Sequence, residues 1–153
     1  MGRTELSLRH GVRPEDRWHG LVLKAVDGTS VQLMDTPENQ AGYPQPSSQK
    51  PGCGFPVMGM VGMLNMSHGG WEGFTTGNWK LHDAKAAQRL LGYVDAGDLI
   101  LADRAFCSYE LIARIQQRGA ECLMRLHQAR HRKLDWRRGK KISPMERLID
   151  RRQ

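Results

Sequence analysis

Apolar and polar positions divide the chain into short segments, and the earliest of them predict strands. Leu21 to Val26 is rich in apolar residues, and Val31 and Leu33 alternate with polar neighbours. Between them stands Asp27-Gly28, a pair favoured in tight hairpin turns. The pattern therefore predicts a strand that delivers an aspartate at its end, then a turn and a short second strand.

A second pair of strands is expected in the middle of the chain. Val57 to Met66 is apolar at both alternating positions, which is typical of a strand covered on both faces. His68-Gly-Gly70 predicts a turn that brings the chain back through Trp71 to Thr76. Together these segments predict an antiparallel hairpin.

The following residues alternate between the helical period and short apolar runs. Apolar positions on one face and a glycine stop predict a helix from Asp83 to Leu91, ended by Gly92. Further elements are expected in this order: a strand over Leu99 to Ala102, a helix over Tyr109 to Arg118 capped by Ser108 and ended by Gly119, and a strand over Cys122 to Leu126.

The order β-β-β-α-β-α-β predicts an α/β fold. Three antiparallel strands come first, and right-handed crossovers then lead to parallel neighbours. The expected result is a mixed five-stranded sheet with flanking helices, in which the strands before Asp27 and Asp103 lie side by side at the centre. This is the order of a ribonuclease-H-like fold that is C-terminally truncated, because its last helix is lacking.

Asp35 to Pro56 is rich in proline and glycine and is predicted to be loop, unable to sustain a helix or a central strand. A loop of this length in a compact domain is usually functional or disordered. We therefore expect it to lie over a site.

The charge of the chain is concentrated at one end. The 153 residues suit a single domain, and the formal net charge is +7. From Arg125 to Gln153 there are 11 Lys or Arg and 3 Asp or Glu, a net of +8, whereas the residues before Arg125 sum to −1. Such a block indicates either a surface for backbone phosphates or a solvated arm.

Composition also narrows the class of protein. Three cysteines without a C-x-x-C pair argue against a disulfide framework or a structural zinc site. No apolar run approaches the ~20 residues of a membrane helix, and the first residues lack the apolar core of a signal peptide. No membrane partner and a cytoplasmic location are expected.

Asp27 and Asp103 are the candidate catalytic residues. Each has an ordinary explanation when taken alone, a hairpin turn for Asp27 and an Asx turn for Asp103. Taken together they favour a catalytic role, because two carboxylates at the centre of one sheet would repel each other unless a cation lay between them. Hard oxygen ligands suit Mg²⁺ or Mn²⁺, and such ions promote phosphodiester chemistry.

These residues and their surroundings resemble DDE transposases of the insertion-sequence-4 family. The resemblance rests on Asp27-Gly-Thr29, Asp35-Thr-Pro-Glu-Asn39, Lys50-Pro-Gly-Cys-Gly-Phe-Pro56, Leu101-Ala-Asp-Arg-Ala-Phe106 and Ser108-Tyr109, and it covers about Trp18 to Leu148. It implies a ribonuclease-H-like fold and Mg²⁺-dependent cleavage and strand joining at transposon ends. Asp27 matches the first metal-binding acid of the family and Asp103 the second.

The resemblance also implies a third acid, a glutamate on a late helix with a Tyr and an Arg before it and a Lys after it. No segment of this chain has that context: Glu110, Glu121 and Glu146 all lack it. The chain is therefore predicted to be a fragment or a truncated reading frame that doesn't transpose DNA alone. Its expected parts are an N-terminal arm at 1–20, an incomplete catalytic core at 21–126 and the basic start of a family-type insertion at 127–153.

DNA is the expected partner, as transposon ends and as target, and a homodimer is one assembly open to the full-length enzyme. The candidate contacts to DNA are Arg104, Lys50, Arg130, Arg132, Lys133, Arg137, Arg138, Lys140 and Lys141. For Arg104 a structural ion pair is an equal alternative, and for Lys50 solvent exposure is the simpler one. His127 and His131 fit phosphate contact or solvation better than metal binding. Trp136 could stack on a base or pack within the insertion.

Three functions follow from these patterns. The first is the catalytic-domain portion of a DNA transposase. The second is a non-catalytic DNA-binding remnant of one. The third, an unrelated ribonuclease-H-like nuclease, needs its third acid within these residues.

Overall fold

The computed structural model describes residues 12–50, 52–126, 128, 135, 137, 139–144 and 146–148. The elements in chain order are η1 (Pro14–Asp16), β1 (Val22–Gln32), α1 (Pro37–Gly42), β2 (Val57–Asn65), β3 (Gly70–Asn78), α2 (Asp83–Ala87), η2 (Gln88–Tyr93), β4 (Asp98–Ala102), α3 (Tyr109–Gln117), β5 (Glu121–Met124), β6 (Lys140–Ser143) and β7 (Glu146–Leu148), where η marks a 3-10 helix.

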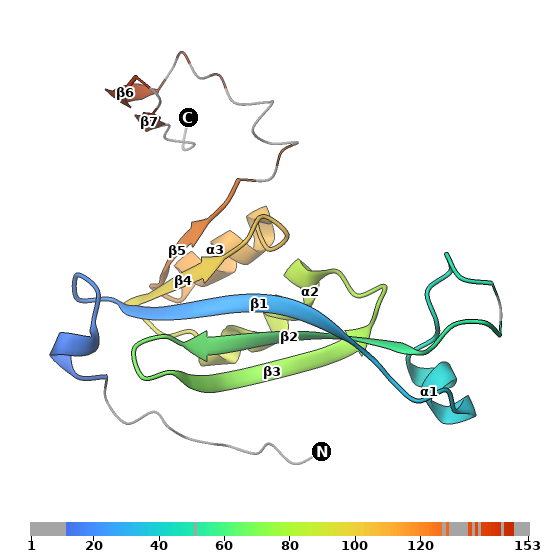
Figure 1. Ribbon diagram of the computed structural model, residues 1–153. Helices are drawn as coiled ribbons and strands as arrows, with labels where there is room; N and C mark the ends of the chain where they lie inside the picture. The colour runs from blue at the N-terminus through green and yellow to red at the C-terminus, as the bar shows by residue number, and fades with distance from the viewer. Residues whose placement is uncertain are drawn as a thin grey trace.

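The centre of the fold is a mixed sheet of five strands in the order β3-β2-β1-β4-β5 (Figure 1). β1 is the middle strand, antiparallel to β2 and parallel to β4. β4 is in turn parallel to β5, and α3 connects the two. The predicted α/β class, the mixed five-stranded sheet and the central pairing of the two acid-bearing strands are therefore confirmed.

The predicted hairpin turn at Asp27-Gly28 is wrong. β1 runs through both residues without interruption and pairs with β2 over nine residue pairs, with Asp27 opposite Gly62 and Gly28 opposite Val61. The preference of two residues for a turn is a local effect of small size. Here the ladder to β2 outweighs it, because a turn at these residues would break a ladder that continues to Gln32.

The sequence predicted the bounds of one helical segment in the second half of the chain correctly and those of the other incorrectly. α3 begins at the predicted cap, where the Ser108 hydroxyl accepts a hydrogen bond from the Leu111 N–H at 3.2 Å, and Gly119 follows its end with φ +73°. In contrast, the helix expected over Asp83 to Leu91 is regular only to Ala87 and continues as η2. Gly92 lies inside η2 and is not among the glycines with positive φ, so it doesn't cap a helix.

The segment expected to be entirely loop contains the short helix α1. Pro37 occupies its first turn, where the missing N–H has no cost, and the Thr36 hydroxyl accepts a hydrogen bond from the Asn39 N–H at 3.2 Å. The side chain of Gln40 then donates to the carbonyl of Gly54 at 3.1 Å and ties the helix to the returning chain. A proline at the first helical position starts a helix rather than preventing one.

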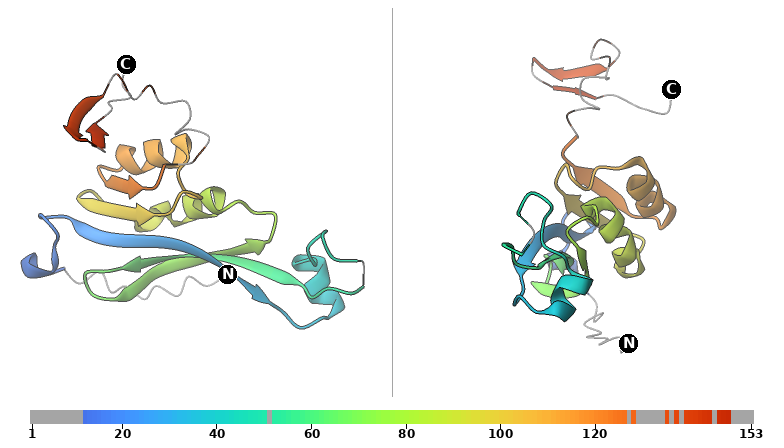
Figure 2. Two further views of the ribbon diagram at one scale, coloured as in Figure 1. Left: turned by 45° about the horizontal axis from the view of Figure 1, so that its top comes forward. Right: turned by 90° about the vertical axis from the view of Figure 1, so that its right-hand side faces the viewer.

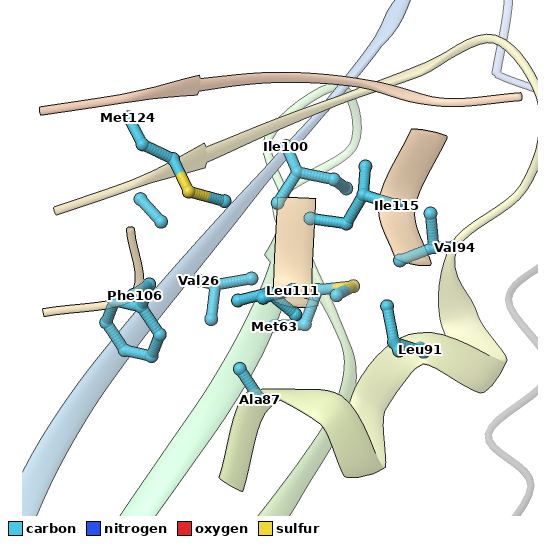
Figure 3. Close-up of a pocket in the computed structure, with 11 residues that line it drawn as sticks. Val26, Met63, Ala87, Leu91, Val94, Ile100, Phe106, Leu111, Ile115 and Met124 are labelled. Atoms are coloured by element: carbon cyan, nitrogen blue, oxygen red, sulfur yellow. The ribbon is translucent and has the colours of Figure 1, made fainter. Parts of the chain in front are cut away.

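The hydrophobic core lies between one face of the sheet and the helices α2, η2 and α3, which gather on that side (Figure 2). Figure 3 shows how the side chains of the strands meet those of the helices, with Val26, Met63 and Ile100 facing Leu111 and Ile115. The empty space enclosed among them is about 10 Å³. The core is thus filled, and it isn't a ligand cavity.

The opposite face of the sheet is not covered by any helix of the described residues (Figure 2). Trp71 and Phe74 of β3 are 63% and 68% exposed, and Leu123 of β5 is 63% exposed. The prediction that the strand over Val57 to Met66 is covered on both faces is therefore wrong: in β2, Val61 and Met63 are buried in the core, whereas Met60 and Leu64 of the other face are partly exposed.

A two-stranded hairpin, β6 with β7, lies beyond the main sheet (Figure 1). Its pairs include Lys140 with Leu148 and Lys141 with Arg147. The hairpin falls within the segment predicted to be the basic start of an insertion. The three-part division of the chain stays a prediction.

Candidate metal centre

The register of the two central strands brings the candidate acids together. Val26 of β1 is the partner of Ala102 of β4 in the last pair of the parallel ladder. Asp27 and Asp103 are the residues that follow this pair in β1 and after β4. Paired neighbouring strands lie about 4.8 Å apart. Both aspartates are exposed. They lie at the carboxyl end of the ladder, the end at which open α/β sheets bind ligands.

Alternation along β1 explains why the Asp27 carboxylate belongs to the open face of the sheet. Val26 and Ala102 pack into the core beneath the helices. Because successive side chains of a strand point to opposite faces, Asp27 follows Val26 on the uncovered side. Asp103 is the first residue after β4, and its side chain is exposed.

Backbone N–H groups hold one oxygen of each carboxylate. The Gly28 N–H donates to Asp27 Oδ1 at 2.8 Å, and the Ala105 N–H donates to Asp103 Oδ1 at 2.7 Å. The second contact closes an Asx turn, so the turn expected at Asp103 is present. Among the hydrogen bonds and ion pairs of the described residues, Oδ2 takes part at neither aspartate. The turn orients Asp103 and leaves an oxygen available for a ligand.

No third acid joins the pair in the part of the chain that the structure describes. There, no three His, Cys, Asp or Glu side chains are grouped so that they could hold a metal ion. Asp83 of α2 lies near Gly28: its Oδ1 would be 3.4 Å from a Cβ placed on Gly28, on the side of the sheet where Val61 and the helices pack. Glu110 is engaged in an exposed ion pair with Arg114 at 2.9 Å.

The basic residues predicted to contact DNA are placed as follows. Arg104 is exposed in the turn beside Asp103, and no ion pair among the described residues involves it. The ion pair that was the alternative role of Arg104 is therefore not seen among the described residues. Lys50 is exposed in the loop between α1 and β2.

The basic tail is described only in part. Arg137, Lys140 and Lys141 are exposed, the last two on β6. The candidates outside the described residues are Arg130, Arg132, Lys133, Arg138, His127, His131 and Trp136. Their predicted roles stay predictions.

Sequence reasoning missed a groove that adjoins Asp27. Its volume is about 570 Å³, and its lining consists of Asp27, Gly28, Thr29, Met60, Gly62, Trp71 and Phe74. The available signal was the pair of large aromatic residues in a strand whose other positions are small or polar. That signal didn't suffice, because the exposure of Trp71 and Phe74 depends on which face the helices cover.

The comparison with known families agrees with the fold and with the acid pair. The family model described as "Transposase DDE domain" matches residues 18–151. The chain therefore belongs to the transposase DDE domain family, a family of enzymes, and its mixed five-stranded sheet is the ribonuclease-H-like sheet expected of it.

The chain is also similar to two curated relatives from Escherichia coli (strain K12). The protein InsZ, whose name assigns it provisionally as a transposase, is 28% identical over 106 residues, which cover 69% of this chain and 36% of InsZ. The transposase InsG for insertion sequence element IS4 is 28% identical over 105 residues, 69% of this chain and 24% of InsG. The chain thus spans about a third of the length of InsZ and about a quarter of the length of InsG. The match to InsG agrees with the resemblance to the insertion-sequence-4 family.

No solved structure matches the chain. None of the described helices is long and apolar enough to cross a membrane.

Proposed function

We propose that this chain is the catalytic-domain portion of a DNA transposase, in which Asp27 and Asp103 are the first two metal-binding acids of a site for DNA cleavage and strand transfer at insertion-sequence ends. The observation that carries the proposal is the register of β1 and β4, in which the two aspartates directly follow paired residues. Membership of the transposase DDE domain family supports it.

The donor set fits Mg²⁺ or Mn²⁺. Two exposed carboxylates on one face of a sheet offer the hard oxygen ligands that these ions prefer. When bound, such an ion supplies positive charge that activates a nucleophile and stabilises a leaving oxygen in phosphodiester chemistry. The backbone N–H groups of Gly28 and Ala105 hold the carboxylates in place, and Arg104 is available to attract a DNA phosphate.

We further propose that this polypeptide on its own doesn't complete transposition. The described residues offer two clustered carboxylates and no third ligand from His, Cys, Asp or Glu. Removing one member of a catalytic unit usually abolishes most of its turnover. An unrelated ribonuclease-H-like nuclease would need a third acid beside this pair, and the described residues hold none grouped with it.

A supercoiled-plasmid nicking assay in Mg²⁺ and in Mn²⁺ tests this activity. We expect little or no nicking by the chain alone. Robust nicking that disappears in Asp103→Asn would contradict the proposed inactivity while it supports the site. Nicking that persists in both Asp27→Asn and Asp103→Asn would contradict the site itself.

The second candidate function is DNA binding without catalysis. The net charge of +8 from Arg125 to Gln153, together with the exposure of Arg137, Lys140 and Lys141, favours it. Such a chain could compete with a full enzyme for transposon ends. Binding and nicking measured separately distinguish the two functions. A DNA substrate is also in keeping with the predicted cytoplasmic location, and a homodimer of the full-length enzyme stays a prediction.

A further inference from the structure

The two edges of the five-stranded sheet differ in what covers them. β3 and β5 are the edge strands (Figure 1). On β3 the Arg89 side chain donates to the Thr76 carbonyl at 3.2 Å, so the chain itself supplies a partner there. β5 pairs with β4 on one side, and no strand of the described residues pairs with its other side. An uncovered strand edge is a template for pairing with another strand.

The backbone of β5 directs the polar groups of Cys122 and Met124 to this free edge. The Gly97 carbonyl accepts from the Val22 N–H at 3.1 Å, so the odd-numbered residues at β4 bond to β1 and the even-numbered ones bond to β5. In a parallel ladder the groups that bond a residue belong to the neighbours of its partner. The odd-numbered residues of β5 therefore bond to β4, and Cys122 and Met124 present their N–H and C=O groups outward.

The side chains along the edge are complementary to a second copy of themselves. Cys122 and Met124 pack against the core, so Glu121 and Leu123 lie on the open face. Leu123 is 63% exposed, and both Glu121 and Arg125, the residue after β5, are exposed. No ion pair among the described residues involves Glu121 or Arg125. An exposed leucine thus stands midway between a carboxylate and a guanidinium.

We propose that a second copy of this chain pairs with β5 along this edge, antiparallel and centred on Leu123. In this register Cys122 of one copy lies opposite Met124 of the other, and these are the residues whose backbone groups point outward. The two Leu123 residues form the non-hydrogen-bonded pair at the two-fold axis, where side chains approach most closely. Glu121 of each copy then faces Arg125 of the other, which gives two ion pairs related by symmetry.

Charge complementarity is the reason to assign a second copy rather than an unrelated strand. Edge strands that avoid pairing carry charges that repel a copy of themselves. This edge carries one charge of each sign, and reversing the direction of the strand brings opposite signs together. The contact is a short strand, so we expect a weak dimer. The inference uses neither the metal centre nor DNA.

Sedimentation velocity over a range of protein concentrations, in EDTA and without DNA, tests the proposal. We expect an equilibrium between monomer and dimer. Arg125→Glu places two carboxylates opposite each other at both ion pairs, and it should weaken the dimer about ten-fold. Lys85→Glu makes the same change of charge at an exposed lysine of α2 and should leave the equilibrium unchanged.

Exchanging the two charges separates this pairing from a general effect of charge. The double variant of Glu121→Arg and Arg125→Glu has the same net charge as the wild type and again presents opposite signs across the two-fold axis. Its dimer should return to nearly the wild-type affinity. Circular dichroism checks that each variant is folded.

A cross-link reports the register. Cα atoms of a non-hydrogen-bonded antiparallel pair lie about 4.5 Å apart, which a disulfide can span. We expect mild oxidation of Leu123→Cys to link two copies at this position. Glu121→Cys is the control, because position 121 faces position 125 of the other copy and not itself. Peptide mapping by mass spectrometry distinguishes this link from one through exposed Cys53.

Three results would overturn the proposal. A protein that stays monomeric at every concentration would leave the edge to a strand of another protein. A dimer that Arg125→Glu doesn't weaken would use another surface. A dimer that the double variant doesn't restore, or that Leu123→Cys doesn't link, would exclude the register. Should a charge variant fail to fold, the cross-link still decides the question.

Discussion

Lys24 and Asp98 form a buried ion pair across the two central strands, with Lys24 Nζ 2.8 Å from Asp98 Oδ2 and both side chains 5% exposed. Lys24 also donates to the Tyr93 carbonyl at 2.6 Å and lies 3.5 Å from Glu72. The pair belongs to the two parallel strands whose ladder ends at Val26 and Ala102, directly before Asp27 and Asp103. It therefore helps to maintain the register on which the candidate metal centre depends.

Breaking this pair should destabilise the fold strongly. Asp98→Ala leaves the Lys24 ammonium buried with one remaining carboxylate, that of Glu72 at 3.5 Å. We therefore expect the free energy of unfolding to fall by about 3–5 kcal/mol. Urea denaturation followed by circular dichroism measures the change. Glu110→Ala is the matched control, because its ion pair with Arg114 is exposed and should contribute at most about 0.5 kcal/mol. Equal effects of the two variants would contradict this account.

The acid pair should bind a divalent ion, weakly but specifically. We expect Asp27→Asn and Asp103→Asn each to reduce Mn²⁺ affinity by ten-fold or more, on the order of the loss seen when metal-ligand partners are removed. Isothermal titration calorimetry gives the affinity. Asp35→Asn removes an exposed carboxylate that accepts from Gln40 at 2.8 Å, and it should leave the affinity unchanged. Identical affinities in all four proteins would refute the metal centre.

Two glycines that both looked like helix stops should respond differently to alanine. Gly119 has φ +73°, and an added Cβ would lie 3.0 Å from that of Ala96, so Gly119→Ala should destabilise the protein by about 1–2 kcal/mol. At Gly92 φ is not positive and an added Cβ meets nothing within 4 Å. Gly92→Ala should therefore be neutral or slightly stabilising. Thermal unfolding measures both, and a reversed order would contradict the observed backbone.

The three cysteines should differ in reactivity toward iodoacetamide. Burial, with a smaller contribution from Glu121, raises the pKa of the Cys122 thiol. A higher pKa means a smaller thiolate fraction at any pH below it, and the thiolate is the reactive form. We expect exposed Cys53 to be modified first at pH 8, and Cys122 to react faster as the pH is raised. Mass spectrometry of tryptic peptides at several times follows each site; modification of Cys122 before Cys53 would contradict the prediction.

DNA binding should depend steeply on salt and on the tail. Each phosphate contact that is lost lowers the slope of log affinity against log salt by about 0.9. The double variant of Lys140→Gln and Lys141→Gln should therefore reduce the slope by up to about 2. Lys85→Gln removes an exposed lysine from α2 and serves as the control. Fluorescence anisotropy at several salt concentrations measures the slope, and binding that is indifferent to salt would remove the proposed role of the tail.

The sequence by itself determined the α/β class and the mixed five-stranded sheet, because apolar periodicity and helix caps are local signals. It also made Asp27 and Asp103 the candidate acids. Ser108 and Gly119, for example, marked the ends of α3 correctly. Local signals failed where long-range pairing decided the outcome. At Asp27-Gly28 a preference for a turn was overruled by the ladder between β1 and β2.

Only the tertiary structure decided how the site is built. The pairing of Val26 with Ala102 places Asp27 beside Asp103, and the helices cover only the other face of the sheet. The groove that adjoins Asp27 is lined by residues of β1, β2 and β3, which the pairing of these strands brings together. Register and coverage depend on contacts between residues distant in the chain, and no local pattern records them.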